Sequence, residues 1–107
     1  FTGLSNYIYT SVDGANAYWT VSSEQLNVKK LLTTTFDGTT TKFYINALKN
    51  GERANASILK TLNGFRVGGS NNQYANIKVY RVMIYNRALS PEEVEYNYNI
   101  DKQRFDL

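Results

Sequence analysis

The sequence predicts an all-β protein that ends in one short α-helix, and three observations lead to this fold class. Stretches rich in β-branched and aromatic residues alternate with short stretches that contain Gly, Asn and Asp, as strands alternate with turns. Residues 79–85 are the last of these stretches and are predicted to form the closing strand. The motif Ser90-Pro91-Glu92-Glu93 that follows has the composition of a helix start.

The helix is predicted over residues 91–103. The Ser90 side chain can cap the exposed amides, Pro91 fits the first helical position, and the Glu93 carboxylate can reach back to the Ser90 amide. Basic residues near the predicted end suit the negative pole of the helix dipole. The side expected to face the sheet carries Val94, Tyr98 and Asp101.

Side chains on both sides of this corner are expected to hold it together. Arg87 follows the strand and precedes a helix start rich in glutamate, so it is predicted to pair with a nearby carboxylate or with carbonyls. Asn97 and Tyr98 are expected to dock the helix onto the sheet.

Upstream of the corner, the pattern predicts a first hairpin. Residues 6–12 alternate tyrosines with smaller residues, and residues 17–23 return after the tight turn Asp13-Gly14-Ala15-Asn16. A second pair is predicted from residues 26–36 and 42–48, joined by a turn at Asp37-Gly38.

Shorter elements complete the predicted chain. The second hairpin is expected to have a longer arm that turns at Asn50-Gly51. In the closing stretch Ile77 and Val79 share one phase while Val82 and Ile84 share the other, so a bulge or burial on both faces is expected. The remaining predictions are two short strands and a polar loop at residues 54–61, 64–69 and 70–73.

The composition excludes several classes of function. The absence of cysteine excludes disulfides, thiol nucleophiles and the usual zinc sites, and the absence of histidine excludes the commonest general base. The net charge of +3 comes from scattered Lys and Arg, which gives no nucleic-acid footprint. No apolar run is long enough for membrane insertion.

The C-terminal third resembles the closing segment of the laminin G-like, concanavalin A-like jelly-roll modules found in bacterial secreted and phage structural proteins. The resemblance is closest over residues 82–90 and continues through Glu92-Glu93-Val94, Asn97-Tyr98 and residues 102–105. Weaker similarity lies in Thr35-Phe36-Asp37-Gly38 with residues 42–46, and in residues 65–69. Three positions depart from the family pattern: Lys29 where a tryptophan is usual, and Ala47 and Ile77 where a glycine is common.

The resemblance implies a β-sandwich of antiparallel sheets, closed by the helix at about 91–103. It also implies that residues 1–107 form a single laminin G-like domain that lacks its N-terminal strands. The preceding part of the same domain, or another protein chain, is therefore an expected partner.

Two groups of residues are candidates for binding. An aromatic platform for sugar rings could form from Tyr7, Tyr9, Tyr18 and Trp19, although the same residues could simply be cross-strand pairs that hold a hairpin. Asn71 and Asn72 lie in a polar loop where a ligand could bind. No cofactor is required by the sequence, but Ca²⁺ is a candidate because oxygen ligands occur at Asp13, Asn16 and Asp37, which turns also favour.

Catalysis is not expected. A glycosidase needs two acids about 5–10 Å apart in one groove, and no predicted strand carries two alternating acids. The sequence favours a non-catalytic recognition module that binds carbohydrate or a cell surface, displayed on a secreted bacterial protein or phage fibre. The alternative is a structural accessory domain of a virion or surface assembly. Both place the protein outside the cell, at the cell surface or at the virion surface.

Overall fold

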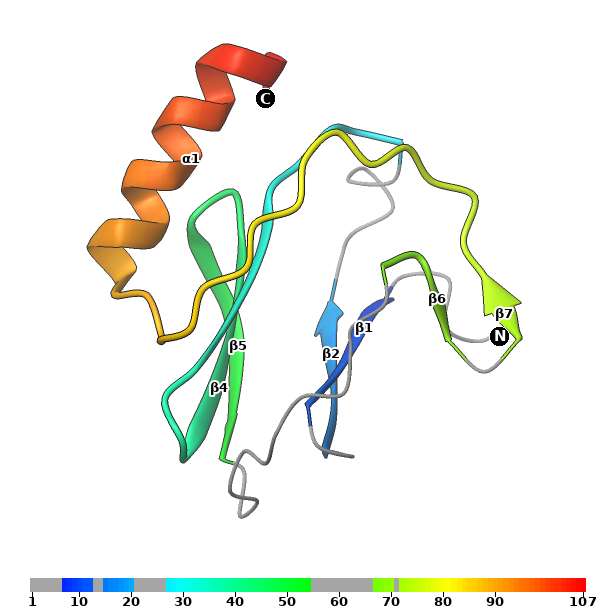
Figure 1. The fold of residues 1–107 in the computed structure, drawn as a ribbon, viewed down its shortest axis with the longest axis vertical. Helices are drawn as coiled ribbons and strands as arrows, with labels where there is room; N and C mark the ends of the chain where they lie inside the picture. Colours follow the sequence, from blue (N-terminus) through cyan, green and yellow to red (C-terminus); the bar gives the residue numbers. More distant parts are fainter. Residues whose placement is uncertain (1–6, 13–14, 21–26, 55–66, 71) are drawn as a thin grey trace.

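The computed structural model describes residues 7–12, 15–20, 27–54, 67–70 and 72–107 (Figure 1). In chain order the elements are β1 (Tyr7–Val12), β2 (Ala15–Thr20), β3 (Leu32–Phe36), β4 (Thr40–Ile45), β5 (Leu48–Ala54), β6 (Gly69–Ser70), β7 (Gln73–Tyr74) and α1 (Pro91–Phe105). The strands pair antiparallel as β1–β2, β3–β4–β5 and β6–β7. The mostly-β architecture with a C-terminal helix is the one that the sequence predicts.

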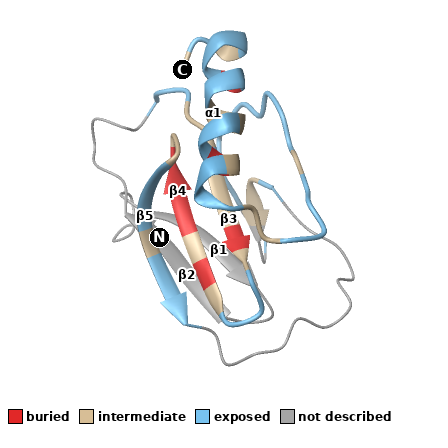
Figure 2. Cartoon of the chain, turned by 90° about the vertical axis from the view of Figure 1, so that its left-hand side faces the viewer, coloured by how far each residue is buried: buried red, intermediate tan, exposed pale blue. Residues whose placement is uncertain are grey.

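The three-stranded sheet carries the core of the described residues. In its central strand, β4, the consecutive residues Phe43, Tyr44 and Ile45 are all buried (Figure 2). Since successive strand residues point to opposite faces, β4 is covered on both sides. α1 lies over one face of this sheet and the β1–β2 hairpin lies on the other side (Figures 1 and 2). From α1, Val94 is fully buried.

The turn between β4 and β5 differs from the predicted one. The chain turns at Asn46 and Ala47, whose φ angles of 50° and 66° are the positive values that a two-residue type I′ turn requires. The Asn46 side chain also accepts a hydrogen bond from the Leu31 amide at 2.9 Å. The predicted turn at Asn50-Gly51 is wrong. The register passes from Gly51 to Lys49, so Asn50 is the extra residue of a β-bulge inside β5.

The first hairpin is confirmed, with a shorter turn. Val12 pairs with Ala15, so Ala15 and Asn16 lie in β2 and not in the turn that the sequence predicted. β2 ends at Thr20, and residues 21–23 of the predicted strand lie outside the described residues. For β1 and β2, the structure describes the course of the backbone and the pairing register.

The predictions for the middle of the chain are confirmed in part. β3 is shorter than the predicted strand 26–36, because residues 27 and 28 form a turn and bend and residues 29–31 have no regular structure before Leu32. Of the predicted strand 54–61, Ala54 is the last residue of β5, and residues 55–61 lie outside the described residues, as does the start of the strand 64–69. The polar loop predicted at 70–73 is the tip of the β6–β7 hairpin, with Ser70 and Gln73 paired across it.

The closing strand is the largest departure. Residues 75–85 form no strand, and residues 76–87 make no backbone–backbone hydrogen bond to any described residue. Just before this stretch, the Ala75 amide donates to the Gly68 carbonyl at 2.8 Å. A preference for the pleated conformation yields a strand only where a neighbouring strand supplies hydrogen-bond partners. The described part of the chain supplies no such neighbour.

α1 confirms the predicted corner and ends at Phe105, two residues beyond the predicted end at 103. Ser90 Oγ accepts a hydrogen bond from the Glu93 amide at 3.2 Å, and the Glu93 carboxylate accepts one from the Ser90 amide at 2.9 Å. This is the reciprocal capping box that the motif predicts, with Pro91 at the first position. Asp106 closes the helix in the left-handed conformation.

Candidate functional site

The β1–β2 hairpin brings three of the four predicted platform residues together. Tyr9 pairs with Tyr18, and Tyr7 pairs with Thr20. Because successive positions alternate between faces, Tyr7, Tyr9 and Tyr18 hold positions on one face of the ladder. Trp19 holds a position on the other face, opposite Ile8. A single flat platform would therefore contain the three tyrosine positions without the tryptophan.

The Asp37 carboxylate accepts hydrogen bonds within its own turn. Its Oδ1 accepts hydrogen bonds from the Thr39 amide at 2.9 Å, the Thr39 hydroxyl at 3.0 Å and the Thr40 amide at 2.8 Å. These bonds, led by the Thr40 amide, lower the pKa of the Asp37 carboxyl to about 2. A carboxylate in an Asx-turn is the turn role that the sequence offered beside the calcium role.

The calcium hypothesis stays a prediction. Asp13 lies outside the described residues, and Asn16 lies in β2 opposite Ser11. Within the described ranges, no three acidic side chains gather into a group that could hold a metal ion. A calorimetric titration with calcium tests the hypothesis.

The structure describes one of the two candidate residues in the polar loop. Asn72 is exposed at the tip of the β6–β7 hairpin with a φ of 65°. Asn71 lies outside the described residues. The left-handed φ suits Asn because its short polar side chain tolerates this conformation better than most residues do.

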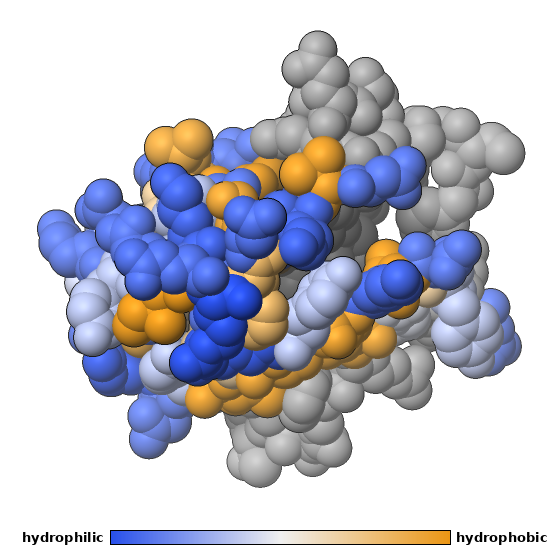
Figure 3. Space-filling model, turned by 90° about the horizontal axis from the view of Figure 1, so that it is seen from above, coloured by the Kyte–Doolittle hydropathy of each residue, from blue (hydrophilic) through white to orange (hydrophobic). Residues whose placement is uncertain are grey.

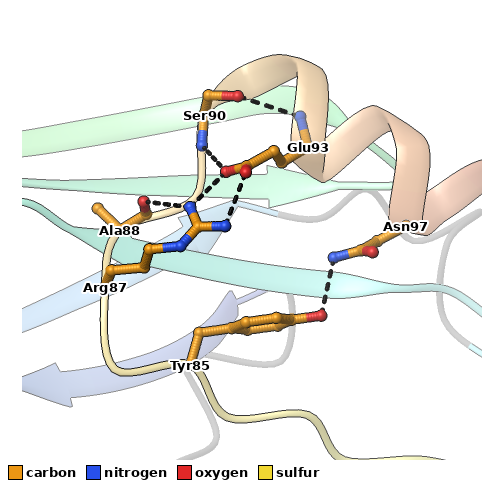
Figure 4. Close-up of polar contacts among 6 residues, drawn as sticks. All are labelled: Tyr85, Arg87, Ala88, Ser90, Glu93 and Asn97. Atoms are coloured by element: carbon orange, nitrogen blue, oxygen red, sulfur yellow. Dashed lines mark hydrogen bonds and ion pairs between the residues drawn. The ribbon is translucent and has the colours of Figure 1, made fainter.

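The corner at which the chain enters α1 is held by a bidentate ion pair (Figure 4). Arg87 donates from both terminal nitrogens to the two carboxylate oxygens of Glu93, each at 2.7 Å, and from Nη1 to the Ala88 carbonyl at 3.4 Å. The predicted role of Arg87 is therefore confirmed. Hydrogen bonds from Arg87, and then from the Ser90 amide, lower the pKa of Glu93 to about 2. The same pair raises the pKa of Arg87.

A second contact joins the predicted docking residue Asn97 to Tyr85 (Figure 4). The Asn97 amide donates to the Tyr85 hydroxyl at 3.1 Å. Asn97 thus docks the helix onto the segment before the corner. Tyr98, the other predicted docking residue, is half-buried, and the Lys102 ammonium lies 5.9 Å from its ring centroid.

The sequence did not predict the partner of Asp101. Arg81 donates from Nη1 to Asp101 Oδ1 at 2.6 Å, and the Asp101 side chain is 2% exposed. A buried carboxylate requires such a partner. An acid on the apolar side of a helix, facing an arginine within an apolar stretch, was the available signal. Further along the same side, the Tyr80 and Phe105 rings lie 5.9 Å apart.

Lys29 contacts the C-terminal end of α1. Its ammonium donates to the Phe105 carbonyl at 2.8 Å and lies 6.0 Å from the Tyr80 ring centroid. A cation at this end of a helix satisfies a carbonyl that has no partner within the helix. Lys29 stands where the resembled family usually has a tryptophan, so this helix end is held here by a charged residue.

Four of the described carboxylates have hydrogen-bond or ion-pair partners within the fold. Asp37 closes a turn, Glu93 caps α1 and pairs with Arg87, and Asp101 pairs with Arg81. In addition, Glu52 pairs with Lys49 across an exposed surface of β5.

In the described part of the chain, the helix is neither long nor apolar enough to span a bilayer.

Comparison with known families identifies the class of protein. The Laminin_G_3 model, described as the concanavalin A-like lectin/glucanases superfamily, matches residues 3–95. This match covers most of the chain, so the chain belongs to that superfamily, as the closing segment predicted.

One solved structure has the same fold. It is the 2.1 Å crystal structure of an S-layer domain-containing protein (residues 221–444) from Clostridium thermocellum ATCC 27405, with a TM-score of 0.59 and 23% identity. The alignment covers 78% of this chain and 45% of that one, so the present chain spans less than half of the solved protein. No curated protein matches the sequence.

Proposed function

We propose that this chain is a non-catalytic recognition module that binds carbohydrate, displayed on an extracellular, cell-surface or virion-surface protein. Membership of a superfamily that includes lectins supports this class of function. The surface location is supported by the structural similarity to an S-layer domain-containing protein. A non-catalytic role is supported by the structural use of Asp37, Glu93 and Asp101, which leaves them bound within the fold.

The observation that carries the proposal is the register of the β1–β2 hairpin. It puts the Tyr7, Tyr9 and Tyr18 positions on one face of a two-stranded ladder. Aromatic rings offer broad apolar surfaces with a polar tip, which suits stacking against sugar rings.

A glycan array tests the proposal with single variants. Tyr18→Ala is expected to abolish retention of the bound glycan while the thermal transition stays nearly unchanged. Tyr96→Ala is the matched control, because Tyr96 is an exposed tyrosine on α1, away from the hairpin. Trp19→Ala separates the two faces: it leaves binding intact if the tyrosine face is the platform. Binding to no glycan, or equal binding by Tyr18→Ala and the parent, would contradict the proposal.

A structural role in a surface assembly is the second candidate. The observation that favours it is β5, which within the described part of the chain pairs only with β4 and whose residues other than Gly51 are exposed. Such an edge is a template for pairing with another chain unless it is covered. Obligate co-purification with a partner chain, together with no selectivity on the array, would favour this role over recognition.

A further inference from the structure

Aromatic and basic side chains alternate along one side of the last turns of α1. Tyr98, Lys102 and Phe105 are spaced four and three residues apart, and residues at this spacing are neighbours on the surface of a helix. The Lys102 ammonium lies 5.9 Å from the centroid of the Tyr98 ring. The order along this side of the helix is therefore ring, cation, ring.

Two residues from other parts of the chain continue the same pattern. The Tyr80 and Phe105 ring centroids lie 5.9 Å apart, at an interplanar angle of 49°. The Lys29 ammonium lies 6.0 Å from the Tyr80 centroid and donates to the Phe105 carbonyl at 2.8 Å. Residues 27–31 and 76–80 run side by side at the top of Figure 1, near the C-terminal end of α1. The cation–aromatic strip consists of Tyr98, Lys102, Phe105, Tyr80 and Lys29.

The strip is open to solvent. Tyr80 is 59% exposed, both lysines are exposed, and Tyr98 and Phe105 are half-buried. Seen from above, hydrophilic side chains gather over α1, with hydrophobic side chains between them (Figure 3). The strip thus presents apolar ring surface beside ammonium groups.

The acidic residues of the helix leave the charge of the strip largely uncompensated. Glu92 and Glu93 lie in the first turn, about 14 Å along the helix axis from Lys102. This distance exceeds the Debye length of about 8 Å at physiological ionic strength. The carboxylate of Asp101 is nearer, but it is buried and bound to Arg81.

The lysines keep their capacity to bind an anion. An ammonium group has three N–H donors, and the Phe105 carbonyl accepts from one of those on Lys29. Lys78, two residues before Tyr80, is also exposed and adds a positive charge, whereas the exposed Asp106 that closes the helix adds a negative one. The local balance of these groups remains positive.

We propose that the cation–aromatic strip binds an acidic sugar unit of a glycan. The sugar ring would stack against the exposed part of the aromatic rings, and its charged group would accept hydrogen bonds from Lys29 or Lys102. A small inorganic anion would make no use of the rings, and a neutral sugar would make no use of the ammonium groups. An acidic sugar uses both.

This site is separate from the tyrosine face of the β1–β2 hairpin. The strip lies on α1, whereas the hairpin lies on the other side of the three-stranded sheet (Figures 1 and 2). It also depends on Lys29, one of the positions at which this sequence departs from the pattern of the resembled family. The site is therefore a property of this chain, and it does not depend on the proposed role of the hairpin.

A titration followed by nuclear magnetic resonance tests the proposal. The probe is a short oligomer of galacturonic acid, and its methyl ester is the neutral control with the same sugar rings. The acid is expected to shift the amide signals of residues in the strip. The ester is expected to bind at least about tenfold more weakly, because it has lost every charged contact.

Two pairs of variants locate the site. Lys102→Gln is expected to weaken binding of the acid about two- to fivefold, and glutamine has nearly the same helix propensity as lysine. Arg104→Gln is the matched control, because it removes the same charge from the same turn two residues away, on the opposite side of the helix. Tyr80→Leu is expected to weaken binding about fivefold, and Tyr96→Leu, on an exposed tyrosine of α1, is its control.

The proposal is contradicted by absence of binding, by equal binding of the acid and its ester, or by equal losses in Lys102→Gln and Arg104→Gln. Binding of polyphosphate or of a single-stranded oligonucleotide as tightly as the acid would also contradict it, since charge without a sugar acid would then suffice. Tyr18→Ala separates this proposal from the role of the hairpin, because it is expected to leave binding of the acid unchanged. Signal shifts confined to the hairpin would place the acid there and not on the strip.

Discussion

β4 and the segment 76–85 have similar compositions, but β4 is buried and the segment is exposed. Both are rich in aromatic and β-branched residues, and each also carries a basic residue, one in β4 and two in the segment. β4 lies between β3 and β5, and its Phe43, Tyr44 and Ile45 are buried. The segment 76–85 has no neighbouring strand among the described residues and remains exposed. The comparison indicates that strand propensity is a local property, whereas strand formation depends on a partner.

The largest expected effect separates these two regions directly. Phe43→Ala removes a buried ring from the central strand and is expected to lower the free energy of unfolding by about 3–5 kcal/mol. Ile84→Ala removes a side chain that is 63% exposed and is expected to change it by less than about 0.5 kcal/mol. Urea denaturation followed by circular dichroism measures both. Similar losses for the two variants would contradict the contrast between the regions.

The next effect concerns the contact that binds the segment to α1. Arg81→Ala leaves the Asp101 carboxylate buried without its partner, and loss of one member of a buried pair costs about 3–5 kcal/mol. Because the Arg81 side chain is 37% exposed, the lower end of that range is expected. Thermal and urea unfolding give the value. Arg104→Ala, on an exposed arginine of the last helical turn, is the control and is expected to change stability little.

A smaller effect is expected at the β4–β5 turn, and it has the opposite sign. Ala47 adopts a φ of 66°, a left-handed conformation that costs a non-glycine residue about 1–2 kcal/mol. Ala47→Gly relieves this strain but increases the freedom of the unfolded chain, so a net gain of about 0.5–1 kcal/mol is expected. Denaturation midpoints measure the gain. Ala54→Gly, at the end of β5, is the control, and a gain there as well would argue against relief of left-handed strain.

The smallest effect is a dependence of the corner on pH. The pKa of Glu93 is lowered from 4.5 to about 2, so its contribution is complete above pH 4.5 and is lost as the pH falls toward 2. Carboxyl titration by nuclear magnetic resonance should give a midpoint near 2. In Arg87→Gln the midpoint should rise toward 4.5, because the arginine is the largest cause of the shift. Arg104→Gln removes the same charge elsewhere on the helix and should leave the midpoint in place.

Sequence reasoning succeeded where structure is determined locally. The capping box at Ser90 and Glu93 joins residues three apart, and the helix follows from it. The turn at Asn46-Ala47 escaped prediction because alanine at positive φ is not a turn signature, whereas Asn50-Gly51 is one and lies in a bulge. The prediction therefore followed the local turn pattern, whereas the register of the sheet places the turn at Asn46-Ala47.

The candidate site shows the same division. Local alternation predicts that Tyr7 and Tyr9 share a face, but only the register of the hairpin places Tyr18 with them and Trp19 opposite Ile8. The Arg81–Asp101 pair joins residues 20 apart, which a single sequence does not specify. The expectation that the domain has further N-terminal strands comes from the resemblance to the family and not from the residues themselves, and it stays a prediction.

The contacts between the segment and α1 also bear on how this part of the chain folds. Arg87 meets Glu93, Tyr85 meets Asn97, and Arg81 meets Asp101, at sequence separations of 6, 12 and 20 residues. Each contact, once formed, shortens the loop that the next contact has to close. The entropic cost of closing each further loop is therefore small. The contacts can thus form in order of increasing sequence separation, starting beside the first turn of α1. Contacts this close in sequence are expected to form faster than non-local strand pairing.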